Sequence, residues 1–203
     1  MEKIDYKKEF RHLYKASAKK AEIVTVPKMS FLMLDGKGDP NTSQAFQDAI
    51  EVLYPVSYAL KFMIKKGETG LDYGVLPLEG LWWSDDMSSF SVEKKSEWKW
   101  TLMIMQPEIV TTEMVQEAIE QVKTKKNPTS LPLVRFESFE EGESAQIMHI
   151  GPFSEEGPTI EKLHASIESN GRKRKGKHHE IYLSDIRRAV PEKWKTIIRQ
   201  PVS

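Results

Sequence analysis

The chain has 203 residues, with 30 lysines and arginines against 30 aspartates and glutamates, so its formal net charge at pH 7 is zero. Hydrophobic residues make up 39% of the chain, which is enough for a folded core, and the balanced charge disfavours a nucleic-acid partner or attraction to a charged membrane. The absence of cysteine excludes disulfides, thiolate nucleophiles and zinc sites that need sulfur. A charged N-terminus and short apolar runs predict a cytoplasmic protein with no membrane span.

The first half of the chain alternates between strand and helix patterns. A strand pattern ends at a glycine-rich turn, and a long helical pattern follows it with Pro55 inside, which should kink or split the helix. The expected elements are a short helix at about 5–18, a strand at 29–34, a helix from about 43 to 66, and strands at 75–83 and 98–105.

The second half repeats these patterns in a similar order. The acidic Glu-Glu-Gly-Glu sequence at 140–143 indicates a turn, so the strands on either side of it are expected to form a hairpin. The expected elements are a helix at 112–125, strands at 133–139 and 145–150, a helix at 158–169, and strands at 178–184 and 194–202.

The two halves share short sequences in the same order. Leu81-Trp82-Trp83-Ser84-Asp85 is similar to Ile181-Tyr182-Leu183-Ser184-Asp185, and each half later reaches a Gln-Pro pair at the end of a strand. The sequence therefore predicts an α+β fold of duplicated strand-helix-strand-strand modules with pseudo-twofold symmetry. Pockets favour junctions between modules, so the seam between the repeats is the first place to expect a site.

Two strands carry the best candidates for that site. Period-two alternation places Glu180 and Tyr182 on one face of their strand, and alignment of the repeats pairs Tyr182 with Trp82. A carboxylate beside aromatic rings suits a planar, aromatic and often cationic small molecule. Glu79 is a second carboxylate in an apolar strand, and for it and Glu180 a structural ion pair remains an open alternative.

Other aromatic and basic residues are weaker candidates. Trp83, Trp98 and Trp100 are predicted to bind a ligand, although an aromatic residue on a strand is more often part of the core. His149 either faces the seam or packs under a helix. Adjacent His178 and His179 point to opposite faces of a strand and do not readily share an ion, so no metal site is predicted. The basic loop at 172–177 is either solvated or a contact for phosphate.

These strings resemble a known family. His178-His179-Glu180-Ile181-Tyr182-Leu183-Ser184-Asp185, together with Pro77-Leu78-Glu79-Gly80-Leu81-Trp82-Trp83, is similar to the stand-alone members of the GyrI-like small-molecule-binding domain family. The resemblance implies a single domain over residues 1–203, with a first repeat at about 23–107, a second at about 133–203, and a short N-terminal helix at about 5–18. It also implies antiparallel sheets that form a central groove, with helices on the outer face.

The resemblance implies a function as well. Members of this kind bind drug-like aromatic compounds in the groove, and one subfamily hydrolyses the cyclopropane of spirocyclopropane DNA-alkylating antibiotics inside an aromatic cage, without metal or organic cofactor. Applied here, Glu180 or Glu79 would orient or deprotonate the attacking water, and Tyr182 would stabilise charge on the substrate. The alternatives are a protein that sequesters ligands without turnover, or an interaction module acting through the basic loop. The oligomeric state is left open.

Overall fold

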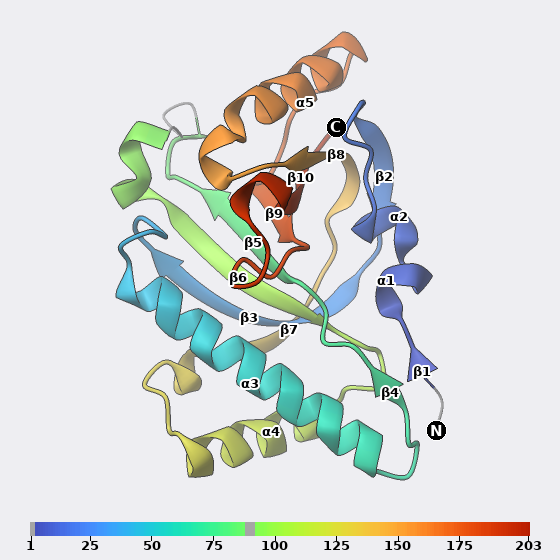
Figure 1. Cartoon of the computed structure of the whole chain (residues 1–203), viewed down its shortest axis with the longest axis vertical. Helices are drawn as coiled ribbons and strands as arrows, with labels where there is room; N and C mark the ends of the chain where they lie inside the picture. The colour runs from blue at the N-terminus through green and yellow to red at the C-terminus, as the bar shows by residue number, and fades with distance from the viewer. Residues whose placement is uncertain (1–2, 88–91) are drawn as a thin grey trace. The chain divides into compact units, whose positions relative to one another are not determined.

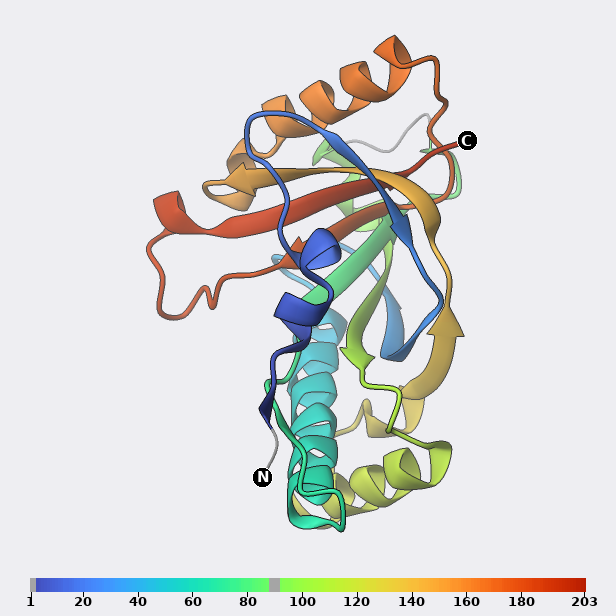
Figure 2. The same ribbon diagram turned by 90° about the vertical axis from the view of Figure 1, so that its right-hand side faces the viewer.

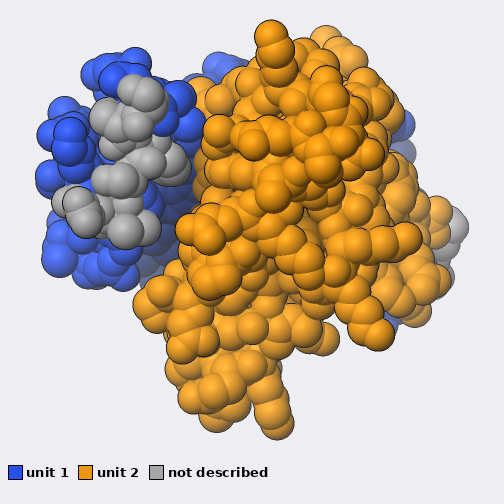
Figure 3. All heavy atoms as spheres, turned by 90° about the horizontal axis from the view of Figure 1, so that it is seen from above, with its two compact units in different colours: residues 1–6, 29–76, 82–139 blue, residues 7–28, 77–81, 140–203 orange. Residues whose placement is uncertain are grey.

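The structure, a computed structural model, describes residues 3–87 and 92–203 (Figure 1). It is a mixed α+β fold with antiparallel strands, as the sequence predicts. The chain divides into two compact units, which Figure 3 colours separately and which we call unit 1 and unit 2. Unit 1 comprises residues 1–6, 29–76 and 82–139, and unit 2 comprises 7–28, 77–81 and 140–203.

Unit 1 is a sheet with two long helices against it. Its elements are β1 (Lys3–Ile4), β3 (Met29–Lys37), α3 (Gln44–Lys66), β4 (Asp72–Tyr73), the end of β5 (Leu78–Trp83), β6 (Lys99–Gln106), α4 (Thr112–Lys125) and β7 (Arg135–Phe139). Strand β3 pairs with β6 on one side and with β7 on the other, both antiparallel. Helix α3 packs on β3 and β6, and α4 lies beside α3 (Figure 2).

The sequence of helix α3 explains where the helix begins and ends. The Ser43 hydroxyl accepts a hydrogen bond from the backbone N–H of Phe46 and so caps the first turn, while Lys65 and Lys66 lie at the negative end of the helix. Pro55 does not split the helix, because α3 is one helix of 23 residues that includes it, while the alternative of a kink stays a prediction. The proline removes one backbone donor, and the apolar face that packs on the sheet and α4 holds the turns together.

Unit 2 contains antiparallel strands and one long helix. Its elements are α1 (Tyr6–Glu9), α2 (Arg11–Tyr14), β2 (Glu22–Val26), the start of β5, β8 (Gly142–Ile150), α5 (Gly157–Ser169), β9 (His178–Tyr182) and β10 (Lys195–Pro201). Strand β10 lies between β8 and β9, and β2 borders β8. Helix α5 closes an apolar core over β8 and β10, formed by Ala145, Ile147, Leu163, Ile167, Ile198 and Val202.

The same connectivity occurs in both units. The sequence β3-α3-β5-β6 in the first half corresponds to β8-α5-β9-β10 in the second. In each half three neighbouring strands end with the strand that precedes the helix: β3 in the run β5-β6-β3, and β8 in the run β9-β10-β8. This repeated order agrees with the predicted duplication, whereas the pseudo-twofold symmetry stays a prediction.

The expected hairpin around residues 140–143 is wrong. Strand β7 pairs with β3, whereas β8 pairs with β2 and β10, so the two strands are not partners. Within the acidic segment Glu140 and Glu143 are exposed, but the side chain of Glu141 is only 2% exposed. Its carboxylate is instead part of a buried network in unit 2.

Candidate functional site

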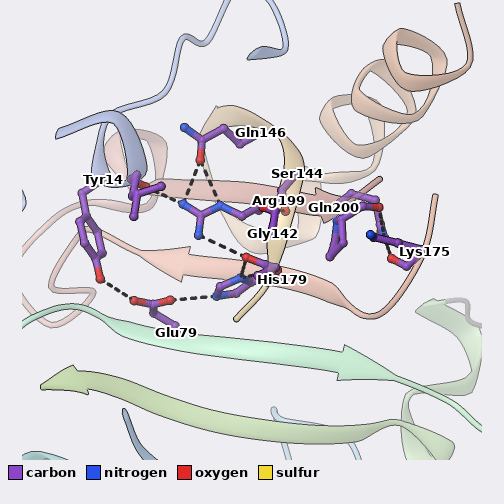
Figure 4. A network of polar contacts seen from close by, with 12 residues as sticks. Tyr14, Glu79, Gly142, Ser144, Gln146, Lys175, His179, Arg199 and Gln200 are labelled. Carbon is purple, nitrogen blue, oxygen red and sulfur yellow. Dashed lines mark hydrogen bonds and ion pairs between the residues drawn. The ribbon is translucent and has the colours of Figure 1, made fainter. Parts of the chain in front are cut away.

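A buried polar network lies on one face of the unit 2 sheet (Figure 4). Its centre is His179 of β9, whose Nε2 lies 2.9 Å from Glu79 Oε2 and whose Nδ1 lies 3.0 Å from Glu141 Oε1. Glu79 also accepts a hydrogen bond from the Tyr14 hydroxyl at 2.9 Å. Arg199 Nη1 lies 3.4 Å from Glu141 Oε2 and so completes an arrangement of two carboxylates and two basic side chains.

The network fastens the N-terminal helices to the sheet. Arg199 donates from Nη2 to the backbone carbonyl of Leu13 at 2.7 Å and from Nε to the side-chain oxygen of Gln146 at 3.1 Å. Gln146 in turn donates to the carbonyl of His12 at 2.8 Å. Helix α2 is too short to be stable by itself, so these contacts hold it in place.

Electrostatics within the network keep both basic groups charged. Burial by itself lowers the pKa of His179, but the adjacent carboxylates of Glu141 and Glu79 outweigh this and raise it to about 9. Burial would raise the pKa of Glu141, yet His179 and Arg199 hold it below its usual range. Burial and the neighbouring Glu79 raise the pKa of Tyr14 well above its ordinary value. Within the network, protonated His179 and ionised Glu141 therefore stabilise each other's charge.

A second polar cluster lies on the opposite face of β9. Glu180 Oε1 is 2.9 Å from His178 Nε2, and Glu180 Oε2 accepts the hydroxyl of Tyr182 at 2.7 Å. Glu180 is opposite Ile198 in the register, and Ile198 belongs to the core under α5, so this cluster faces the same side as α5. The prediction that Glu180 and Tyr182 share a face of the strand is confirmed, as is the separation of His178 from His179.

The carboxylate of Glu180 is held ionised. Burial works to raise its pKa, but the hydrogen bond and the charge interaction with His178, with further help from Tyr182 and His179, hold the pKa below its usual range. The side chain keeps 14% of its surface exposed, compared with 2% for Glu79. Of these two glutamates, Glu180 is the one a ligand can reach.

Aromatic side chains surround the outer end of this cluster. The ring of Phe153 lies edge-on to Tyr182 at 5.7 Å between centroids, and the ring of Trp194 lies 5.0 Å from Phe153. Trp194 is fixed by a hydrogen bond from its indole N–H to the carbonyl of Ala189 at 2.8 Å. Phe153 is 39% exposed, which places apolar ring surface beside Tyr182. Neither Phe153 nor Trp194 was predicted to be a site residue. Phe153 lies in the 3-10 helix Phe153–Glu155, and Trp194, the first residue of the predicted strand at 194–202, lies just before β10.

The predicted tryptophans form their own aromatic cluster in unit 1. Trp82 and Trp98 lie 5.7 Å apart at the centroids, and Phe46 contacts both Trp82 and Trp100. Trp82 and Trp100 are buried, Trp83 and Trp98 half-buried. Trp100 packs directly on Gly36, where an added Cβ would lie 2.1 Å from the indole, so Trp100 is a core residue. Ligand binding by these tryptophans stays a prediction.

His149 and the basic loop have structural partners. His149 is buried, with Nδ1 3.0 Å from the Thr159 hydroxyl of α5 and Nε2 3.2 Å from the carbonyl of Pro152, so it packs under the helix. In the loop, Arg172 pairs with Glu143 at 2.9 Å, and Arg174 Nη1 lies 2.9 Å from His164 Nδ1. These contacts favour a structural role for both arginines.

Two searches of the described residues are negative. Within residues 3–87 and 92–203, no three acidic, histidine or cysteine side chains are grouped so that they could hold a metal ion. No helix in the same ranges combines the length and apolar character that a membrane crossing needs.

Comparison with known proteins agrees with this fold. An uncharacterized conserved protein from Listeria innocua is 45% identical with a TM-score of 0.90, over 98% of this chain and 100% of that one. A hydrolase from the same organism is 44% identical with a TM-score of 0.88, over 100% of both chains. The C-terminal domain of EcmrR is 14% identical with a TM-score of 0.58, over 91% and 97%, and shows the fold alone. No curated protein matches the chain.

The family assignment rests on a match over most of the sequence. The family described as the GyrI-like small molecule binding domain matches residues 19–203, which include both aligned repeats and every site residue predicted from the sequence. The chain belongs to the GyrI-like family of small-molecule-binding domains.

Proposed function

We propose that the chain binds planar aromatic small molecules beside Glu180 and hydrolyses the cyclopropane of spirocyclopropane DNA alkylators. The observation that carries the proposal is the Glu180 cluster itself. A partly exposed, ionised carboxylate is held by His178 and Tyr182, and the partly exposed ring of Phe153 contacts the Tyr182 ring. Such a site offers both an apolar ring surface and a negative charge to a flat ligand.

The structure favours Glu180 over Glu79 as the functional carboxylate. Glu79 contacts His179, which points to the face of β9 opposite Glu180, so the two carboxylates do not serve one bound ligand. The side chain of Glu79 is 2% exposed, compared with 14% for Glu180. We assign Glu79 to the buried network.

The hydrolytic step uses Glu180 to place and deprotonate water. The water oxygen bonds to the cyclopropane CH₂, the strained C–C bond breaks, and its electron pair enters the dienone ring to give a phenolate. Glu180 takes the proton from water, and that proton then passes to the phenolate oxygen, so the net change is addition of one water. Tyr182 already donates to Glu180, so we assign it to holding the carboxylate rather than to the dienone oxygen.

The 44% identity to a hydrolase from Listeria innocua supports a catalytic function. The alternative is binding without turnover, and the lowered pKa of Glu180 favours it, since such a carboxylate is a good counter-charge and a weak base. The two functions share the site and differ in the fate of the ligand.

Mass spectrometry of a spirocyclopropane-dienone alkylator incubated with the protein distinguishes hydrolysis from binding without turnover. Hydrolysis predicts loss of the alkylator with gain of the mass of one water, abolished in Glu180→Gln and retained in Glu192→Gln, an exposed glutamate before β10. Recovery of the unaltered compound bound to the protein supports sequestration. Turnover by Glu180→Gln at the wild-type rate would refute the assigned role.

A further inference from the structure

Helix α3 of unit 1 carries an exposed aromatic pair. Tyr58 is 46% exposed and Phe62 is 47% exposed, and their rings stack with 6.4 Å between centroids and 26° between planes. Half-buried Pro55 and exposed Glu51 lie one and two turns before Tyr58. Because steps of three and four residues keep side chains on one side of a helix, these four residues form a single line, which we call the α3 stripe.

The stacked rings offer a preformed apolar surface. Single exposed apolar residues are ordinary on a protein, whereas aromatic rings that lie together with charged residues around them are typical of a contact with another protein. Helix α4 packs beside α3 (Figure 1), but both rings remain exposed. The Nζ of Lys61 lies 5.7 Å from the centroid of the Phe62 ring, so a positive charge borders this end of the stripe.

Charges are separated along α3. Ahead of Lys61 the charged residues of the helix are Asp48 and Glu51, both acidic. The last two turns carry three lysines, two of which contact the single carboxylate of Asp72, so this end keeps a net positive charge. The separation suits the helix dipole, and it also leaves the stripe acidic at one end and basic at the other.

We propose that the α3 stripe binds a second copy of this chain, with the two α3 helices antiparallel about a twofold axis. In a twofold contact a surface meets itself, so it fits when its two ends are opposite in charge. An axis between residues 56 and 57 places Glu51 opposite the partner's Phe62 and beside the partner's Lys61. It also places Pro55 opposite the partner's Tyr58, so apolar side chains meet at the centre and opposite charges at both ends.

The charges favour this occupant over two others. A parallel pair of α3 helices would bring the two acidic ends together, which costs free energy instead of gaining it. Anionic lipid headgroups would be repelled by Glu51, which lies within the stripe, and helices that bind such surfaces carry basic residues along the whole polar face. An antiparallel second copy satisfies both the rings and the charges.

Sedimentation equilibrium of the full chain at low ionic strength tests the proposal. We expect the average molar mass to rise from that of one chain toward twice that value between about 1 μM and about 200 μM, the range of a small surface contact. Phe62→Glu puts a glutamate opposite the partner's Glu51 and should weaken association about tenfold or more. Leu133→Glu changes a residue outside α3 that is 62% exposed, and should leave association within about twofold.

A charge-exchange variant tests the antiparallel register. In Glu51→Lys combined with Phe62→Glu, each introduced lysine faces an introduced glutamate of the other copy, so association should recover about fivefold or more over Phe62→Glu alone. The two positions lie about 16 Å apart along one helix, too far to pair within a chain, so recovery reports on contact between copies. Circular dichroism and thermal unfolding check that each variant is folded.

Three results would overturn the proposal. One is a chain that stays monomeric over the whole concentration range. Another is self-association that Phe62→Glu and Leu133→Glu change equally. The third is a combined variant that associates no more tightly than Phe62→Glu, which would exclude the antiparallel register. None of these measurements uses a ligand, so their outcome is independent of the proposed function.

Discussion

Replacing Glu79 and Glu180 separately by glutamine should separate stability from ligand binding. Glu79 is 2% exposed and accepts hydrogen bonds from Tyr14 and His179, both at 2.9 Å. Glu79→Gln removes the carboxylate that contacts protonated His179 in a buried network. Breaking a buried pair in this way costs about 3 to 5 kcal/mol, and loss of the proton from His179 relieves part of that, so we expect about 3 kcal/mol.

The same change at Glu180 should cost far less stability. Its carboxylate is partly exposed, and glutamine keeps one oxygen that can accept from His178 or Tyr182, so we expect a loss of about 1 kcal/mol. Binding of N-methylacridinium should show the reverse pattern, retained per folded molecule in Glu79→Gln and lost in Glu180→Gln.

Urea denaturation and thermal unfolding measure the first property, and equilibrium dialysis the second. For a chain of this size, about 3 kcal/mol corresponds to a drop in Tm of about 6 to 12 °C. Glu192→Gln, at an exposed position, serves as the control for loss of one carboxylate. If Glu79→Gln unfolds within about 0.5 kcal/mol of the wild type, or if Glu180→Gln is the less stable variant, the division into a structural and a functional carboxylate is refuted.

Three further changes test the packing and electrostatics. The contacts that raise the pKa of His179 from 6.5 to about 9 add stability that is complete below about pH 6.5 and is lost as pH rises through 9. Urea unfolding should therefore show a loss of about 3 kcal/mol over this pH range, and His179→Gln should lack this loss. Gly36→Ala should lower the free energy of unfolding by about 1 to 3 kcal/mol, because its Cβ would lie 2.1 Å from the Trp100 ring, and an unchanged Tm would contradict this packing. Thr196→Val should raise that free energy by about 1 kcal/mol, because the buried Thr196 hydroxyl has no hydrogen-bond partner among the described residues; a destabilised variant would show that the hydroxyl is bound.

Local patterns predicted most elements of the fold. The helix at 112–125 has the bounds of α4, because Thr111 caps its first turn and an apolar stripe runs along one face. Alternation along β9 placed Glu180 with Tyr182 and separated His178 from His179, since the strand period fixes faces without reference to the rest of the chain.

Local sequence patterns could not predict the buried network. Tyr14, Glu141 and Arg199 come from an N-terminal helix, an acidic segment and the last strand, and only the fold brings them to His179 and Glu79. Glu141 looks like a turn residue in the sequence because its flanking residues are polar. The one available signal was Arg199, a charged residue directly after the apolar pair Ile197-Ile198, where burial requires a partner.

The most direct test of the central claim is a crystal structure of the chain with N-methylacridinium bound. We expect the cation to contact the carboxylate of Glu180, with the plane of its rings stacked on Tyr182 or Phe153. A cation seated away from this cluster, with Glu180 still contacted only by His178 and Tyr182, would contradict it.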